Sequence, residues 1–269
     1  MGTNKKVIIS LKEISLTFKQ DNKEFQALGD INLKVYNDDF ICLLGPSGCG
    51  KTSLLNVLAG YVKPTDGEIS VEGKALKAPN PEVGVIFQQP NLFPWLNVRK
   101  NVEFGLKQKN LKAGERKDIV DYYLEVVGLS SFADMLPYQL SGGMRQRAAI
   151  ARTLATDPKI VLLDEPFSAL DALTREKMQT HIYSIWEKAK KSFFFITHDV
   201  DEALLLSNRV LIMHPNPGTL VKDFKNPLNK DSKHFFREVR ETKQFWDMRE
   251  SLINDIQTEK DEIAVKAAG

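Results

Sequence analysis

The chain carries the stretch Gly45-Pro46-Ser47-Gly48-Cys49-Gly50-Lys51-Thr52, which fits the pattern G-x-x-x-x-G-K-[ST] of a phosphate-binding loop. An apolar run at 40–44 precedes it and predicts a buried strand, and residues 52–59 predict a helix. Glycines let backbone N–H groups curve around a phosphate, and the helix N-terminus adds partial positive charge. We expect Lys51 to reach the β- and γ-phosphates and Thr52 to ligate Mg²⁺. These flanks disfavour the alternative of a glycine-rich turn that matches by chance.

The bulk composition is that of a globular protein rather than a nucleic-acid binder. The 269 residues carry a net charge of only +2, with basic residues scattered among acidic ones. The two cysteines, Cys42 in the predicted strand and Cys49 in the loop, predict no disulfide, which suits a reducing cytoplasm. No apolar run approaches the ~20 residues of a membrane span, and the N-terminus lacks a signal-peptide core.

The N-terminal third predicts a small antiparallel sheet beside the nucleotide core. Residues 7–18 and 27–35 alternate between apolar and polar positions, and 67–73 predicts a further strand. Phe18 falls at a strand end, where it is either an exposed ring that stacks on adenine or a core phenylalanine.

The next buried strand, at 83–87, ends at Gln88, which is either a contact to Mg²⁺ or the attacking water or an ordinary loop residue. An apolar loop with Trp95 follows and predicts an exposed docking surface. Residues 97–125 have a helical pattern, with Gly105 and Gly114 as predicted breaks. We therefore predict a helical subdomain inserted at about 91–157.

The segment Leu140-Ser141-Gly142-Gly143-Met144-Arg145-Gln146-Arg147 predicts a helix start with Ser141 as N-cap. The paired glycines permit close approach of an anion to the first N–H groups. Arg145 and Arg147 occupy the first turns, where the helix dipole disfavours cations, and such a local conflict is typical of functional sites.

Two further predicted strands end in polar residues that could act in catalysis. The apolar run 160–163 ends in Asp164 and Glu165, so we expect Asp164 to hold the metal shell and Glu165 to polarise water. Ser168 or Asp171 caps the next helix, at about 172–189. The strand 192–197 ends at His198, for which a γ-phosphate contact is favoured over a purely structural role.

Together these motifs resemble the ATP-binding subunit of an ABC transporter over nearly the whole chain. In chain order the resemblance comprises the A-loop aromatic Phe18, Walker A at 45–52, the Q-loop Gln88, the signature at 140–146, Walker B at 160–165, the D-loop at 168–171 and the switch histidine His198. It implies an α/β fold: a P-loop ATPase core with a mainly parallel sheet, an N-terminal antiparallel β subdomain and the inserted helical subdomain. The ATPase domain would span 1–225, and a C-terminal helical extension 226–269.

The resemblance also assigns site residues. It implies catalytic roles for Glu165, His198 and Gln88, and Mg²⁺ ligation by Thr52, Gln88 and Asp164. The expected ATP contacts are Phe18, Gly45, Pro46, Ser47, Gly48, Cys49, Gly50, Lys51, Thr52, Ser53, Ser141, Gly142, Gly143, Gln146 and Asp171.

The implied partners follow from the same family. Walker A and Glu165 of one copy would face Ser141 and Gly143 of a second, in a head-to-tail dimer. Transmembrane permease subunits and an external solute-binding protein would complete a transporter at the cytoplasmic face of the inner membrane. The run Phe87 to Val98 is similar to the nitrate, sulfonate and taurine importer group, whose relatives also handle bicarbonate or thiamine-precursor pyrimidines.

Three other classes of ABC protein fit the sequence less well. An ABC ATPase of DNA maintenance would carry long coiled coils or a zinc module, and a translation-type protein would carry two cassettes. A binding-only regulator would be expected to lose Glu165 or His198. The chain has one Walker A and retains both residues, so an ATP-hydrolysing importer subunit is the favoured interpretation.

Overall fold

The computed structural model describes residues 5–20, 23–189, 191–228 and 235–267. The chain divides into two compact units, the first formed by Met1–Pro79 with Phe194–Gly269 and the second by residues 80–193. The boundary falls inside a buried strand, β8 (Ser192–Ile196), so the chain leaves the second unit within an element of regular structure.

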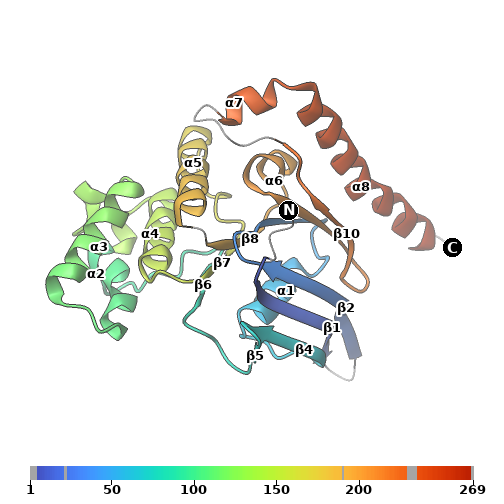
Figure 1. The fold of residues 1–269 in the computed structure, drawn as a ribbon, viewed down its shortest axis with the longest axis horizontal. Helices are drawn as coiled ribbons and strands as arrows, with labels where there is room; N and C mark the ends of the chain where they lie inside the picture. Colours follow the sequence, from blue (N-terminus) through green and yellow to red (C-terminus); the bar gives the residue numbers. More distant parts are fainter. Residues whose placement is uncertain (1–4, 21–22, 190, 229–234, 268–269) are drawn as a thin grey trace. The chain divides into compact units, whose positions relative to one another are not determined.

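The first unit contains an antiparallel sheet with the strand order β2-β1-β4-β5 (Figure 1). Its strands are β1 (Val7–Gln20), β2 (Lys23–Tyr36), β4 (Asp66–Val71) and β5 (Lys74–Ala75). Leu11 lies opposite Leu33 on one side and Ile69 on the other, and all three side chains are buried. The alternation seen in the sequence therefore marks the buried face of the predicted N-terminal sheet.

The same unit holds strands in the order β10-β9-β3-β8. Strand β3 (Phe40–Leu44) runs parallel to β9 (Arg209–His214), and β10 (Thr219–Lys225) pairs antiparallel with β9. Every residue of β3 is buried, as its continuous apolar run predicts. Helices α1 (Lys51–Leu58) and α6 (Val200–Leu206) follow β3 and β8 in the chain.

The C-terminal region is helical, as expected for the predicted extension. Helix α7 (Phe235–Arg240) leads into α8 (Lys243–Ala267), which packs on α6 and β9 (Figure 1). Phe245 and Leu252 are fully buried and anchor α8 to the unit. That a separate C-terminal extension begins at residue 226 stays a prediction.

The second unit contains β6 (Val83–Ile86) and β7 (Ile160–Asp164), a parallel pair in which Ile86 lies opposite Leu163. Between them the chain forms α2 (Val98–Glu103), α3 (Ala113–Val126) and α4 (Gly142–Ala155), which pack on one another. Short 3₁₀ turns occupy Phe104–Gln108, Ser130–Phe132 and Pro137–Gln139, and α5 (Ala172–Ala189) follows β7. The predicted insertion at 91–157 lies in this unit, and its bounds stay a prediction.

One predicted break was wrong. Gly105 lies in a 3₁₀ turn that does end the regular α-helix, but Gly114 lies in the first turn of α3. The helix begins there because the Glu115 carboxylate accepts a 2.7 Å hydrogen bond from the backbone N–H of Lys112. A capped first turn tolerates a glycine that would weaken a helix interior.

Candidate functional site

The predicted phosphate loop connects β3 to α1 within the first unit. Gly48 and Gly50 have φ angles of 81° and 98°, in the left-handed region that favours glycine. A Cβ on Gly50 would also lie 2.8 Å from the carbonyl oxygen of Ala27. The loop therefore requires glycine at this position on both conformational and steric grounds.

Lys51 begins α1 and directs its ammonium group back into the loop. Its Nζ donates 2.8 Å hydrogen bonds to the carbonyl oxygens of Gly45 and Pro46, and the residue is buried. A buried ammonium needs oxygen acceptors, and phosphate oxygens are acceptors of the same kind with added negative charge. The local chemistry of the loop therefore fits a triphosphate.

Cys49 lies in the same loop and is 1% exposed. Burial raises the pKa of its thiol, and the opposing attraction of the Lys51 ammonium is the smaller effect. Neither cysteine forms a disulfide, and both are buried. A neutral thiol is a poor nucleophile, so Cys49 is better explained as a small side chain that fills space in the loop.

Phe18 lies at the exposed end of β1 and is 44% exposed, so it is not a core phenylalanine. It lies directly opposite Phe25 of β2, which is 58% exposed. Residues opposite each other in antiparallel strands share one face of the sheet. The pair is an exposed aromatic platform, and Phe25 is a member that the sequence did not single out; stacking on adenine stays a prediction.

His198 follows β8 and is exposed, as a ligand contact requires. The residues on either side are fixed by hydrogen bonds: the Thr197 hydroxyl donates to the Glu202 carboxylate at 2.6 Å and accepts from the Asp199 N–H at 3.0 Å. Asp199 in turn caps α6 by accepting from the N–H groups of Asp201 and Glu202. The turn that carries His198 is thereby held between the strand and the helix.

The second unit brings Gln88 and Glu165 together. They follow the parallel strands β6 and β7, and Gln88 Nε2 donates to Glu165 Oε2 at 3.4 Å. Glu165 adopts a φ of 44°, and its carbonyl oxygen accepts hydrogen bonds from both the N–H and the hydroxyl of Ser168. A non-glycine residue in this region costs about 1–3 kcal/mol, and such strain gathers at functional sites.

Asp164 closes β7 and is 8% exposed, immediately before Glu165. The Gln88 amide nitrogen donates to Glu165, which leaves the Gln88 amide oxygen as a hard ligand. Mg²⁺ prefers such carboxylate and carbonyl oxygens, so this donor set fits the ion. Among the described residues, no group of three or more His, Cys, Asp or Glu side chains could by itself hold a metal ion.

The signature segment starts α4 as predicted. The Ser141 hydroxyl accepts from the N–H of Met144 at 3.2 Å. The predicted conflict at Arg145 and Arg147 has a structural explanation, because their guanidinium groups donate to the carbonyl oxygens of Leu140 and Val127. Of the two candidate caps for α5, Asp171 is the cap, through the N–H of Thr174, and this backbone hydrogen bond lowers the pKa of its carboxyl.

Helix α4 also holds the strand segment that carries Gln88. Gln146 Nε2 donates to the carbonyl oxygen of Phe87 at 3.0 Å, and Thr153 donates to that of Val85 at 3.1 Å. The Arg152 guanidinium donates to the carbonyl oxygens of Pro90 and Asn91. Gln146 is thus buried against the segment leading to Gln88, and its predicted nucleotide contact stays a prediction.

A buried strand, a glycine-dependent loop and a helix that starts with a buried lysine define a nucleoside-triphosphate-binding protein of the phosphate-loop class. Residues 28–168 match the ABC transporter family. The chain is 43% identical to the taurine import ATP-binding protein TauB of Jannaschia sp. over 257 residues, which are 95% of this chain and 96% of that protein. It is 44% identical over 254 residues to an uncharacterized ABC transporter ATP-binding protein, MJ0412, of Methanocaldococcus jannaschii, covering 94% of this chain and 93% of that one.

The fold resembles a solved dimeric ATP-binding cassette, MJ0796, in a post-hydrolysis state bound to ADP and Pi. The TM-score is 0.75 at 32% identity, over 81% of this chain and 98% of that one. The chain belongs to the ABC transporter family, as an ATP-binding domain. In the part of the chain that the structure describes, every helix is too short or too polar to cross a bilayer.

Proposed function

We propose that this chain is the ATP-hydrolysing subunit of an importer for a small sulfonate-type solute of the taurine class. The observation that carries hydrolysis is the Gln88–Glu165 contact beside the buried Asp164. The TauB relatives at about the same length support the substrate class and favour transport over a DNA-maintenance or translation role.

The chemistry follows from the side chains. The loop N–H groups and the Lys51 ammonium bind the β- and γ-phosphates and offset their charge. Glu165 accepts a proton from the attacking water, and the Gln88 amide holds this carboxylate and the water in place. His198 contacts the γ-phosphate. Mg²⁺, when bound, supplies charge neutralisation, and Thr52, Asp164 and Gln88 are the residues that would hold it.

A second copy completes each ATP site in this proposal. The first N–H groups of α4, at Gly142 and Gly143, have no partners within the helix and suit a γ-phosphate of the other copy. The dimeric MJ0796 cassettes support this arrangement. Ser141→Arg should spare ATP binding by the monomer yet abolish ATP-dependent dimers in light scattering, and dimers formed by this variant would contradict the proposal.

An exposed aromatic cluster in the second unit is the proposed permease contact. Trp95 is 73% exposed and lies 5.8 Å from the Phe93 ring, which also contacts Phe104 and lies beneath the Arg152 guanidinium. An apolar cluster of this kind suits a cytoplasmic helix of a membrane partner. The subunit would then bind at the cytoplasmic face of the inner membrane, with an external binding protein supplying specificity.

The test of transport uses the chain with its native permease and binding protein, in cells that lack their own taurine-import ATPase. Cells expressing the wild-type chain should accumulate radiolabelled taurine, whereas Glu165→Gln should not. Trp95→Ala should retain soluble ATPase activity but lose co-purification with the permease; exposed Tyr138→Ala is the matched control. Uptake of nitrate or bicarbonate without taurine would reassign the substrate.

A further inference from the structure

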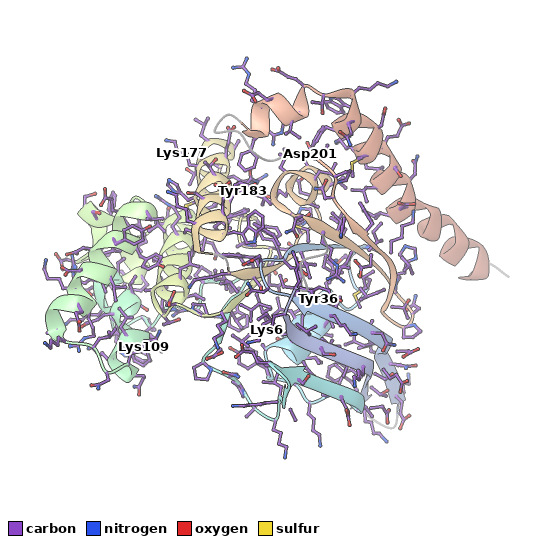
Figure 2. The ribbon with its side chains drawn as sticks, viewed as in Figure 1. Lys6, Tyr36, Lys109, Lys177, Tyr183 and Asp201 are labelled. Carbon is purple, nitrogen blue, oxygen red and sulfur yellow. The ribbon has the colours of Figure 1, made fainter. Side chains whose placement is uncertain are left out.

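The C-terminal helix α8 forms an ion pair with the first turn of α6, the helix that begins shortly after His198. Arg249 of α8 donates through Nε to Asp201 Oδ1 of α6 at 2.6 Å. The two side chains are 37% and 31% exposed. The Arg249 guanidinium also lies over the Trp246 ring, 5.5 Å from its centroid, which limits its rotamers. Asp201 is labelled in Figure 2, on α6 where this helix lies beside α8.

This ion pair continues into the hydrogen bonds around His198. The N–H of Asp201 donates to the Asp199 carboxylate at 2.8 Å, and the N–H of Asp199 donates to the Thr197 hydroxyl at 3.0 Å. His198 lies between these last two residues in the chain. A displacement of the first turn of α6 would therefore be transmitted to the backbone of His198 through three consecutive contacts.

Docking of α8 does not depend on Arg249. Phe245 and Leu252 are buried, and Lys222 of β10 forms a second ion pair with Asp255, farther along α8. Loss of one half-exposed ion pair should leave a helix with these anchors in place. Arg249 therefore has a specific partner, Asp201, close to His198 in the chain, and docking of the helix does not require this contact.

We propose that Arg249 is a positioning residue for His198, so that the C-terminal helix sets the geometry of the γ-phosphate contact; this rests on the proposed ATPase function. Arg249→Gln removes the charge and keeps a similar length. It should lower kcat about 3- to 10-fold, because residues that act through a contact network change coupling modestly. The KM for ATP should stay within about twofold, because the phosphate loop is untouched.

The matched control is Lys222→Gln, which breaks the ion pair with Asp255 of α8 and should leave kcat unchanged. Arg249→Lys keeps the charge and should restore much of the rate. In a His198→Gln background, Arg249→Gln should have no further effect in single-turnover assays. Additive losses, an equal loss in Lys222→Gln, or wild-type kcat in Arg249→Gln would each overturn the proposal.

A second readout does not need activity. The chain has four histidines, so the ring signals of His198 can be assigned in ¹H–¹³C NMR spectra from the peak lost in His198→Gln. Arg249→Gln should shift that peak, and Lys222→Gln should not. An unshifted His198 peak in Arg249→Gln would overturn this inference even if the wild-type chain hydrolyses ATP normally. A wild-type chain without ATPase activity would instead contradict the proposed function.

Discussion

The phosphate loop and the Gln88–Glu165 pair are built in different ways. In the loop, Lys51 bonds to carbonyl oxygens five and six positions away, and glycines supply the backbone shape. In the second unit, Gln88 meets Glu165 across 77 positions, and Gln146 meets Phe87 across 59. The phosphate loop is therefore a local motif, whereas the Gln88–Glu165 pair depends on how strands and helices pack. Variants in the two regions should have separable effects on ATP binding and on hydrolysis.

The largest effect of a substitution is expected in the phosphate loop. Lys51→Gln removes the buried ammonium, and ATP affinity should fall roughly 100-fold or more, because hydrogen bonds to charged groups contribute about 1.5–3 kcal/mol each. Isothermal titration with ATP measures this, and Lys63→Gln, an exposed lysine of the same unit, is the control. An unchanged affinity would remove Lys51 from the site.

A smaller effect is expected for a substitution that loosens the segment leading to Gln88. Gln146→Ala removes a buried side chain that hydrogen-bonds the Phe87 carbonyl, which should cost about 1–3 kcal/mol of unfolding free energy in urea titrations. Turnover should fall with little change in ATP affinity, since Gln88 follows Phe87. Thr153→Val is the matched comparison, because it removes the bond to Val85, farther from Gln88. A rise in the KM for ATP with unchanged turnover would favour a direct nucleotide contact of Gln146.

The backbone of the loop can be tested with two glycines. Both have a positive φ, but a Cβ on Gly50 meets the Ala27 carbonyl at 2.8 Å, whereas a Cβ on Gly48 meets nothing within 4 Å. Each alanine should cost about 1 kcal/mol or more for its φ, with Gly50→Ala the costlier. Thermal unfolding of the two variants gives the order, and equal losses would contradict the steric argument.

The smallest effect concerns Cys49. Burial raises the pKa of its thiol, so at neutral pH the thiolate fraction lies below that of an ordinary cysteine. Maleimide labelling of the native chain should be slower than that of a free thiol and should accelerate as the pH rises above 9. Rapid labelling at pH 7 would show that the loop opens or that another group stabilises the thiolate.

Sequence patterns predicted the elements and the local caps well. The continuous apolar runs at 40–44 and 160–163 are buried strands, and Ser141 is the N-cap of α4. These outcomes depend on periodicity and on residues within one turn of each other. The same reasoning identified Gln88 and Glu165 as candidates, because each follows a buried strand.

Contacts between distant residues could not be predicted. The carbonyl partners of Arg145 and Arg147, which resolve the predicted conflict with the helix dipole, are supplied by the fold. Phe25 could have been found from the hairpin register opposite Phe18. The Arg249–Asp201 pair joins positions 48 apart, and no periodicity in either helix indicates it. Side-chain partners of this kind follow from packing rather than from any local pattern.

In the proposed function, separate groups bind ATP and hydrolyse it. Glu165→Gln tests this separation most directly when ATP affinity and single-turnover hydrolysis are measured on the same preparation. ATP affinity should stay within about twofold of wild type, while the hydrolysis rate should fall about 10²–10⁴-fold, the usual contribution of a general base. A near-normal rate, or a loss of ATP binding that accounts for the slower hydrolysis, would contradict this account.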